Sequence, residues 1–362
     1  RTMHTTGGRI FADKYKNLQD PVLKVFIGGR ELLLCDEAYL GSAWVVSSSK
    51  KEPDMAVVTY LVNRAFPESI RNLEGFLALG QKTEVQAGYG SQVSRIFLGY
   101  LHEISVSDKG EGYLEYTLLC LDVKGLMKKN NGFAVSGVKT AQQVMDEILG
   151  AEIYAPLIEK KTVTPIPASL NTDCVIGGET DYDWLCGLAE RLDYEFFCGR
   201  GELVFCRAGE AYGETVELSA ECGLREVKLI VSMGGQTGSI RVGAYNQADE
   251  KLSVNEPWHG VSGPFVQNLK QRLKGFSLSF WEMGIETGEQ AGQAAKKRMA
   301  RTARQCLRME VRSLGMPKLM PGICVKIADD ASVSLCGSIC AEEVEHRISG
   351  KGYETVVRGT RC

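Results

Sequence analysis

Alternating apolar and polar residues predict β-strands along most of the chain. Near the C-terminus, for example, Ile323, Val325 and Ile327 alternate with more polar neighbours, which is the period of a strand with one buried face. Turns rich in glycine, proline and aspartate separate these runs, because such residues adopt the backbone angles of tight turns. The predicted strands span residues 22–27, 30–35, 55–62, 83–87, 95–105, 113–122, 194–198, 202–207, 215–221, 225–232, 239–245, 307–314, 323–327, 338–347 and 353–358.

A period of 3.6 residues predicts three helices, at residues 140–149, 180–192 and 288–305. Thr140 is a suitable N-cap for the first helix, and Thr180 or Asp181 caps the second. The third helix is rich in alanine, lysine and arginine. Its basic side chains would either bind an acidic partner surface or remain solvated.

Residues 1–20 and 246–276 show neither period, so we expect both segments to be irregular and to order only on assembly. The other patterns predict an α+β, mainly β fold with several domains, as the length of 362 residues also suggests. The predicted boundaries are 1–20 for an N-terminal arm, 21–125 for a first antiparallel β-barrel domain, 126–212 for a helix and helix–hairpin domain, 213–286 for a second β-barrel domain with a long loop, and 287–362 for a helix followed by a C-terminal β-meander.

The composition is that of an ordinary globular protein, with 44% hydrophobic and 24% charged residues. A net charge of −3 gives no reason to expect a nucleic-acid partner, which usually requires a basic face. The chain lacks a run of about 18 apolar residues, so we expect no membrane span, and its first ten residues lack the apolar core of a signal peptide. The 12 cysteines lie mostly within apolar patterns, which predicts reduced thiols in a protein assembled in the bacterial cytoplasm.

The residue types that carry catalysis or bind metals do not form a recognisable pattern. The four histidines are His4, His102, His259 and His346, and none has a second ligand at metal-binding spacing. Cys336 and Cys340 are too far apart along a predicted strand for easy chelation. The glycine-rich stretch at 234–238 lacks the lysine of a phosphate-binding loop, and no carboxylate pair stands out. We therefore predict no catalytic, cofactor-binding or metal-binding residues.

Three stretches, near residues 85–122, 180–207 and 316–358, carry short motifs in a particular order. They include a strand ending in aspartate, a helix with an early tryptophan followed by a hairpin, a Pro-Gly turn, a Val-x-His strand and a closing Gly-Tyr-x-Thr strand. The residues concerned are Gly88, Gly99, Asp122, Trp184, Pro321, Gly322, Gly337, His346, Gly352 and Tyr353. In order and spacing these motifs resemble the baseplate hub proteins of contractile phage tails (the late control protein D family) and the hub half of the type VI valine-glycine repeat protein.

The resemblance implies a structural protein and not an enzyme. It implies a homotrimeric ring in which each chain carries two tube-protein-like β-barrels, so that six similar domains join a sixfold inner tube to a threefold central spike. The implied partners are two further copies of the chain, a spike protein, inner tube or tube-initiator proteins and other baseplate proteins. Because the sequence ends directly after the meander, we expect the spike to be a separate polypeptide, as in a phage tail, a tail-like bacteriocin or an extracellular injection machine.

Two other functions remain open at this point. A tail-associated cell-wall hydrolase would act on peptidoglycan as a monomer and would lose activity on mutation of one carboxylate or cysteine. A soluble β-rich binding module would be a stable monomer. The hub interpretation instead predicts a trimer or co-assembly with a spike.

Overall fold

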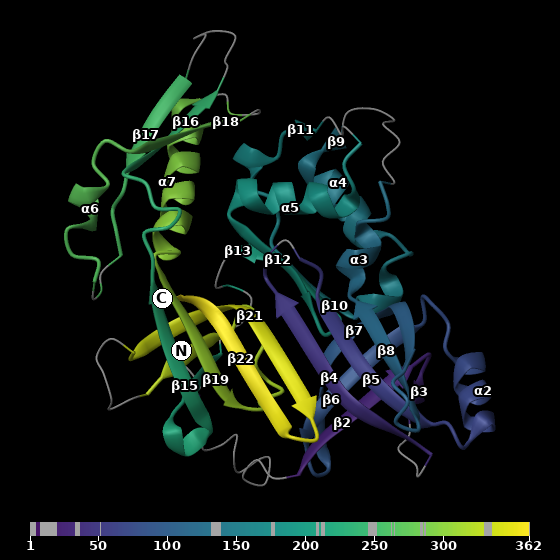
Figure 1. The fold of residues 1–362 in the computed structure, drawn as a ribbon. Helices are drawn as coiled ribbons and strands as arrows, with labels where there is room; N and C mark the ends of the chain where they lie inside the picture. The colour runs from purple at the N-terminus through teal and green to yellow at the C-terminus, as the bar shows by residue number, and fades with distance from the viewer. Residues whose placement is uncertain are drawn as a thin grey trace.

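The computed structural model describes residues 5–7, 20–32, 37–50, 52–131, 139–174, 178–207, 210, 214–244, 252–261, 263, 265–282, 285, 287–328 and 335–361. One 14-stranded sheet dominates the fold, and two smaller units stand on it, one with two small sheets and the other with one (Figure 1). The mainly β, largely antiparallel fold predicted from the sequence is confirmed.

The first half of the large sheet follows the order β4-β5-β8-β7-β6-β2-β3, and all its neighbours are antiparallel. Its strands are β2 (Pro21–Ile27), β3 (Arg30–Glu31), β4 (Ala38–Ser48), β5 (Met55–Asn63), β6 (Lys82–Tyr89), β7 (Gln92–Asp108) and β8 (Tyr113–Leu121), with helix α2 (Pro67–Phe76) between β5 and β6. Gly28 and Gly29 both have positive φ in the β2–β3 turn, as the predicted two-residue hairpin requires.

The second half of the sheet contains the predicted C-terminal meander. Its strands are β1 (Thr5–Gly7), β14 (Thr215–Leu218), β15 (Leu224–Val231), β19 (Leu307–Leu314), β20 (Cys324–Ile327), β21 (Gly337–Ser349) and β22 (Gly352–Arg361). β20, β21 and β22 are consecutive antiparallel neighbours, and β19 and β15 extend the sheet beyond β22. Between the described strands, no pairing closes either half into a barrel.

Strand β21 joins the two halves. One edge of β21 pairs with β22 along most of its length, while the other pairs first with β20 and then, from Glu343 to Ser349, with β4. A register shift between Ala341 and Glu343 marks the point where the partner changes. A single cluster of buried apolar residues, from Val25 to Val357, runs through both halves.

The helix–hairpin unit stands above the first half (Figure 1). Its main elements are α3 (Val123–Met127), α4 (Ala141–Gly150), α5 (Asp181–Leu192) and the hairpin β12 (Tyr194–Gly199) and β13 (Glu202–Arg207), with the short strands β9 (Lys139–Thr140), β10 (Lys160–Val163) and β11 (Asp173–Cys174). The predicted N-caps are confirmed, since the Thr140 and Thr180 hydroxyls accept from the backbone N–H groups of Gln143 and Asp183.

The β16–α7 unit stands beside the helix–hairpin unit (Figure 1). Helix α7 (Gly288–Arg304) covers one face of a three-stranded sheet of order β17-β16-β18, formed by β16 (Ser239–Ala244), β17 (Leu252–Pro257) and β18 (Ser277–Trp281), with α6 (Leu269–Arg272) preceding β18. The strand predicted at 239–245 is present, but it pairs with β17 and β18 and not with the large sheet.

Three sequence predictions need correction. The segment 246–276 is not wholly irregular, because it contains β17 and α6, whose short amphipathic patterns are weak in the sequence. Residues 5–7 of the predicted arm form β1, which pairs in parallel with β14 over a separation that no local pattern reveals. Residues 1–4, 8–19, 246–251, 262 and 264 of these two segments lie outside the described part of the chain.

The third correction concerns the cysteines. Nine described cysteines are free thiols, as predicted, whereas Cys340 is disulfide-bonded. Sequence spacing could not show this bond, because it depends on tertiary proximity. Within the described residues, no helix combines the length and the apolar character needed to cross a bilayer.

A buried charge cluster connects the first half to the helix–hairpin unit. The Lys124 ammonium, in the first turn of α3, donates to Asp54 Oδ1 at 2.9 Å and to the Glu52 carbonyl at 2.9 Å, and lies 3.6 Å from Asp122 Oδ2. Burial raises the pKa of both carboxyls, that of Asp122 further. Although burial alone would lower the pKa of Lys124, the two neighbouring carboxylates raise it, so the lysine stays charged.

We expect Lys124→Met to destabilise the protein by about 3–5 kcal/mol, because it leaves two buried carboxyls without their cation. Urea unfolding at neutral pH measures this loss. Lys129→Met, at an exposed position on the same segment, should change the free energy of unfolding little. Equal stability of the two variants would contradict a structural role for the cluster.

Candidate functional site

Two of the residues singled out from the sequence, His346 and Tyr353, meet where the segment 315–320 passes between the two sheet halves. We call this region the seam. It consists of the backbone of residues 315–319 and the side chains of Tyr89, Arg200, His346, Tyr353 and Thr355. The seam brings together β6, the tip of the β12–β13 hairpin and strands β21 and β22.

His346 lies at the centre of the seam and is fully buried. Its Nε2 is 3.1 Å from the Leu319 carbonyl oxygen, which can only accept, so this nitrogen carries the proton. The Tyr353 hydroxyl can then donate to Nδ1 over 2.9 Å, and Thr355 Oγ1 lies 3.2 Å from the same nitrogen. Burial, together with the positive charge of Arg200, lowers the pKa of His346 to about 3. The imidazole is therefore a neutral, fixed crosslink.

Two tyrosines hold the segment 315–320 against the sheet. The rings of Tyr89 and Tyr353 stack with centroids 5.7 Å apart, and the Tyr89 hydroxyl donates to the Gly315 carbonyl at 2.8 Å. A Cβ at Gly315 would lie 2.0 Å from the Tyr353 ring, so only glycine fits here. The Met316 N–H donates to Thr355 Oγ1 at 2.8 Å, which anchors the next residue.

The β12–β13 hairpin reaches the seam through Arg200 at its tip. This residue has a positive φ, and its guanidinium donates to the Leu319 carbonyl at 2.8 Å. Arg95 of β7 donates to the Arg200 carbonyl and also pairs with Glu84 and Glu159. One carbonyl, that of Leu319, therefore links the hairpin to His346 in the meander.

The structure brings some of the predicted motif residues together and keeps others apart. His346 and Tyr353 meet in the seam, and the Pro321-Gly322 turn directly follows the segment that they hold. Gly337 and Gly352 begin β21 and β22 with positive φ. Gly88 precedes Tyr89 in β6, next to the seam.

The other three motif residues lie outside the seam. Asp122 accepts from the Lys124 N–H as the N-cap of α3 and belongs to the buried charge cluster. A Cβ at Gly99 would lie 2.1 Å from the Leu121 carbonyl, so glycine permits the close β7–β8 contact beside this cluster. Trp184 packs in the separate core of the helix–hairpin unit.

Sequence reasoning missed Tyr89, Arg200 and Gly315. Tyr89 continues the buried alternation of β6, and Gly315 follows a predicted strand as an ordinary turn glycine would. These local signals predict burial and a turn. They do not reveal that the three residues meet, because that depends on the pairing of distant strands.

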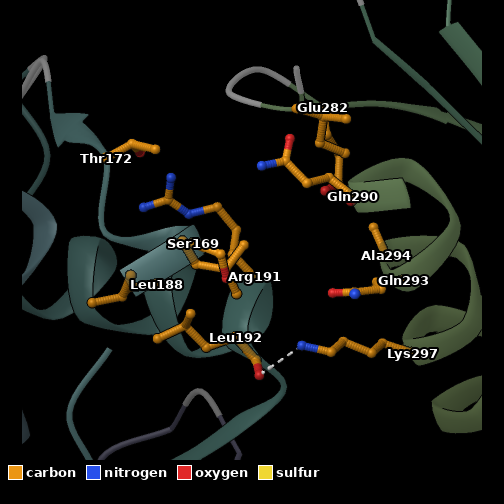
Figure 2. Close-up of a pocket in the computed structure, with 12 residues that line it drawn as sticks. Ser169, Thr172, Leu188, Arg191, Leu192, Glu282, Gln290, Gln293, Ala294 and Lys297 are labelled. Atoms are coloured by element: carbon orange, nitrogen blue, oxygen red, sulfur yellow. Dashed lines mark hydrogen bonds between the residues drawn. The ribbon is translucent and has the colours of Figure 1, made fainter. Parts of the chain in front are cut away.

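The basic side chains of α7 mostly contact groups of the same chain. Lys297 donates to the Leu192 carbonyl at the end of α5 (Figure 2), and Arg301 pairs with Asp193 at 3.0 Å. The Lys297 contact satisfies a carbonyl at the negative end of the α5 dipole, and Arg301 pairs with the carboxylate of the α5 C-cap residue. Arg298 pairs with Glu282 at 2.5 Å, whereas Lys296 remains exposed. These contacts account for most of the basic side chains of α7, so an acidic partner surface, one of the two alternatives predicted for them, is not needed to explain them.

Two cavities border this contact between α5 and α7. The smaller, of about 70 Å³, lies between Arg191 and Leu188 on one side and Gln290 and Gln293 on the other (Figure 2). The larger, of about 480 Å³, has walls of both charge signs. Among the described residues, no group of three or more His, Cys, Asp or Glu side chains could hold a metal ion. The buried carboxyls of Asp54 and Asp122 are closed off by Lys124 and do not face either cavity.

The buried state of His346 predicts a pH dependence of stability. Between about pH 6.5 and 3 the unfolded state binds a proton that the native state excludes, so stability falls as the pH decreases through this range. The loss should approach about 1.4 kcal/mol per pH unit. The glutamine of His346→Gln takes up no proton in the unfolded state. The difference in free energy of unfolding between wild type and this variant should therefore shrink on acidification.

Urea unfolding of wild type and His346→Gln between pH 7 and pH 4.5 measures that difference. His259→Gln, at an exposed position, serves as the matched control and should keep the acid sensitivity of the wild type. A constant difference between wild type and His346→Gln across the range would contradict a neutral, buried imidazole.

Comparisons with known proteins agree with this arrangement. The model of a family described as phage tail baseplate hub (GPD) matches residues 70–352. No curated protein matches the sequence. A tail protein from Neisseria meningitidis MC58 is 14% identical, with a TM-score of 0.70 over 94% of this chain and 97% of that one.

Two further solved structures share the fold. The 43 kDa tail protein of prophage MuSo2 from Shewanella oneidensis is 15% identical, with a TM-score of 0.67 over 94% of this chain and 98% of that one. An E. coli protein described as a component of the type VI secretion system is 12% identical, with a TM-score of 0.59 over 94% and 77% of the two chains. The family match covers most of the sequence, and the chain therefore belongs to the phage tail baseplate hub family.

Proposed function

We propose that this baseplate hub protein acts as a homotrimeric symmetry adaptor. Three copies would form a ring in which the two sheet halves of each chain provide six similar surfaces towards a sixfold inner tube. The threefold side of the same ring would receive the central spike. The proposal makes self-association, and not catalysis, the activity of the chain.

The observation that carries this proposal is the outer face of the first half. On β5, residues alternate between buried and half-buried, so that Ala56, Val58 and Tyr60 fill the core. The opposite, half-exposed face carries Val57 and Leu61, which are also apolar. A soluble sheet with one solvated face would carry mainly polar residues there.

Cross-strand neighbours extend this apolar face. In register, Val57 lies between Trp44 of β4 and Leu119 of β8, and the Trp44 side chain is 41% exposed. Thr59 lies between Ser42 and Thr117 in the next row. An apolar row of this kind, flanked by small polar residues, is typical of a surface that another subunit covers.

The first test is the mass of the purified chain in solution, alone and with a spike protein encoded beside it. We expect a trimer, or a complex of three hub chains with three spike chains, because a closed ring satisfies identical interfaces. Sedimentation equilibrium measures the mass directly. A monomer that does not bind the spike protein would overturn the adaptor role.

Val57→Glu tests the face itself. A carboxylate at the centre of a dry interface should shift the protein to monomer and weaken association about tenfold or more, which corresponds to about 1.4 kcal/mol. Ile153→Glu is the matched control, because it places the same charge on another exposed aliphatic side chain outside the sheet. Loss of association in both variants, or in neither, would exclude this face as the interface.

A further inference from the structure

The β16–α7 unit has an open sheet edge that the proposed ring does not involve. Within the described residues, β18 pairs only with β16, in parallel, so it forms one edge of the three-stranded sheet. Strand β17 forms the other edge. Open edges present rows of backbone donors and acceptors to any extended chain that approaches.

The flanking hydrogen bonds show which backbone groups of β18 face outward. The Phe276 carbonyl accepts from the Ser239 N–H at 3.1 Å, and the Glu282 N–H donates to the Gly243 carbonyl at 3.0 Å. Because backbone groups alternate sides along a strand, the even-numbered residues bond to β16. The N–H and C=O groups of Ser277 and Ser279 therefore point away from the sheet, and no described residue pairs with them.

The two edges of this sheet differ in how they are protected. On β17, Val254 and Glu256 pair with β16, so Pro257 sits at an outward position, where its missing N–H interrupts the edge. On β18, residues 276–281 contain no proline and no charged residue. The usual devices that block edge pairing are thus present on one edge and absent from the other.

Exposed apolar side chains mark the same open edge. The Phe276 side chain is 62% exposed and that of Leu278 is 47% exposed. Leu278 lies on the face that α7 covers, next to Phe280, whose ring stacks against the Arg298 guanidinium at 4.5 Å. An additional strand beside β18 would bury these apolar side chains.

The charged residues that directly precede β18 in the sequence are all positive. Residues 265–281 contain Lys270, Arg272 and Lys274 but no carboxylate. All three are exposed, and none forms an ion pair with a described residue. Arg241, opposite Ser279 in β16, is likewise exposed without an ion pair in the described chain. Nearby Glu282 is already paired with Arg298.

We propose that the outer edge of β18 binds an extended, acidic segment of a partner protein as an additional β-strand. The outward backbone N–H and C=O groups of Ser277 and Ser279 form the hydrogen bonds to the added strand, and the side chains of Phe276 and Leu278 supply apolar contacts. The cations before β18 select negative side chains. This binding does not depend on formation of a trimer.

The test uses the full-length protein and a labelled synthetic peptide of about ten residues that alternates glutamate and valine. Fluorescence anisotropy should show saturable binding, about tenfold or more tighter than that of the same peptide with lysine for glutamate. Ser279→Pro removes one outward N–H and should weaken binding about tenfold or more. Asn255→Pro is the matched control, because Asn255 occupies the same sheet row on the β17 edge and should leave the affinity unchanged.

A second pair of variants leaves the backbone intact. Arg272→Glu combined with Lys274→Glu should also weaken binding of the acidic peptide, whereas Lys296→Glu on α7 should not. In hydrogen exchange, the bound peptide should slow the amides of Ser277 and Ser279 but not those of Leu278 and Phe280. This pattern is specific to strand addition.

Each other outcome overturns the proposal. Three results would exclude an acidic strand at this edge. They are the absence of saturable binding, equal affinity for the two peptides, and an equal loss of affinity for the acidic peptide in Ser279→Pro and Asn255→Pro. If a DNA oligonucleotide binds more tightly than the peptide, and this binding is lost in the double variant Arg272→Glu, Lys274→Glu but not in Ser279→Pro, the basic residues before β18 would bind nucleic acid. Self-association that Ser279→Pro abolishes would assign the edge of β18 to a second copy of the chain.

Discussion

The fold depends on strand β21 sharing one of its edges between two partners. That edge first pairs with β20 and then, after the irregularity at Ala341 and Glu343, with β4. A straight, regular strand would present one continuous edge to one neighbour. The extra residue bends and twists the strand, so β21 can belong to two curved half-sheets at once. The shared apolar core and the seam both follow from this arrangement, because it brings strands from the N-terminal and C-terminal parts of the chain together.

The parts of the molecule are joined in two physically different ways. Apolar burial joins the two halves of the large sheet, and this contribution is nearly independent of ionic strength. Polar contacts hold the β16–α7 unit against α5, among them Lys297 with the Leu192 carbonyl and Arg301 with Asp193. Salt screens such exposed contacts, and each stabilises by well under about 1 kcal/mol. Apolar burial therefore holds the large sheet together, whereas the contact between α5 and the β16–α7 unit should weaken as the salt concentration rises.

Most individual elements could be predicted from the sequence, because their apolar periods are local. The alternation of β5 and the N-caps Thr140 and Thr180 are clear examples. Strand β4 was missed, since a bulge after Leu40 and the exposed Trp44 break its alternation. The resemblance of the sequence motifs to the hub family identified His346 of the seam. The residues of β6 and of the hairpin that complete the seam could not be predicted. Their contacts depend on strand pairing across the whole chain, which no local pattern encodes.

The pairing of β4 with β21 also sets an order of events during synthesis. The hydrogen bond from Trp44 to Glu345 spans 301 residues. At ribosomal rates of about 5–20 residues per second, β4 leaves the ribosome roughly 15–60 s before β21 exists. Throughout that interval the nascent first half has an unpaired edge strand beside a half-exposed apolar face. The growing polypeptide is therefore most prone to aggregation before its last strands are translated, and the C-terminal meander is the segment that ends this vulnerable period.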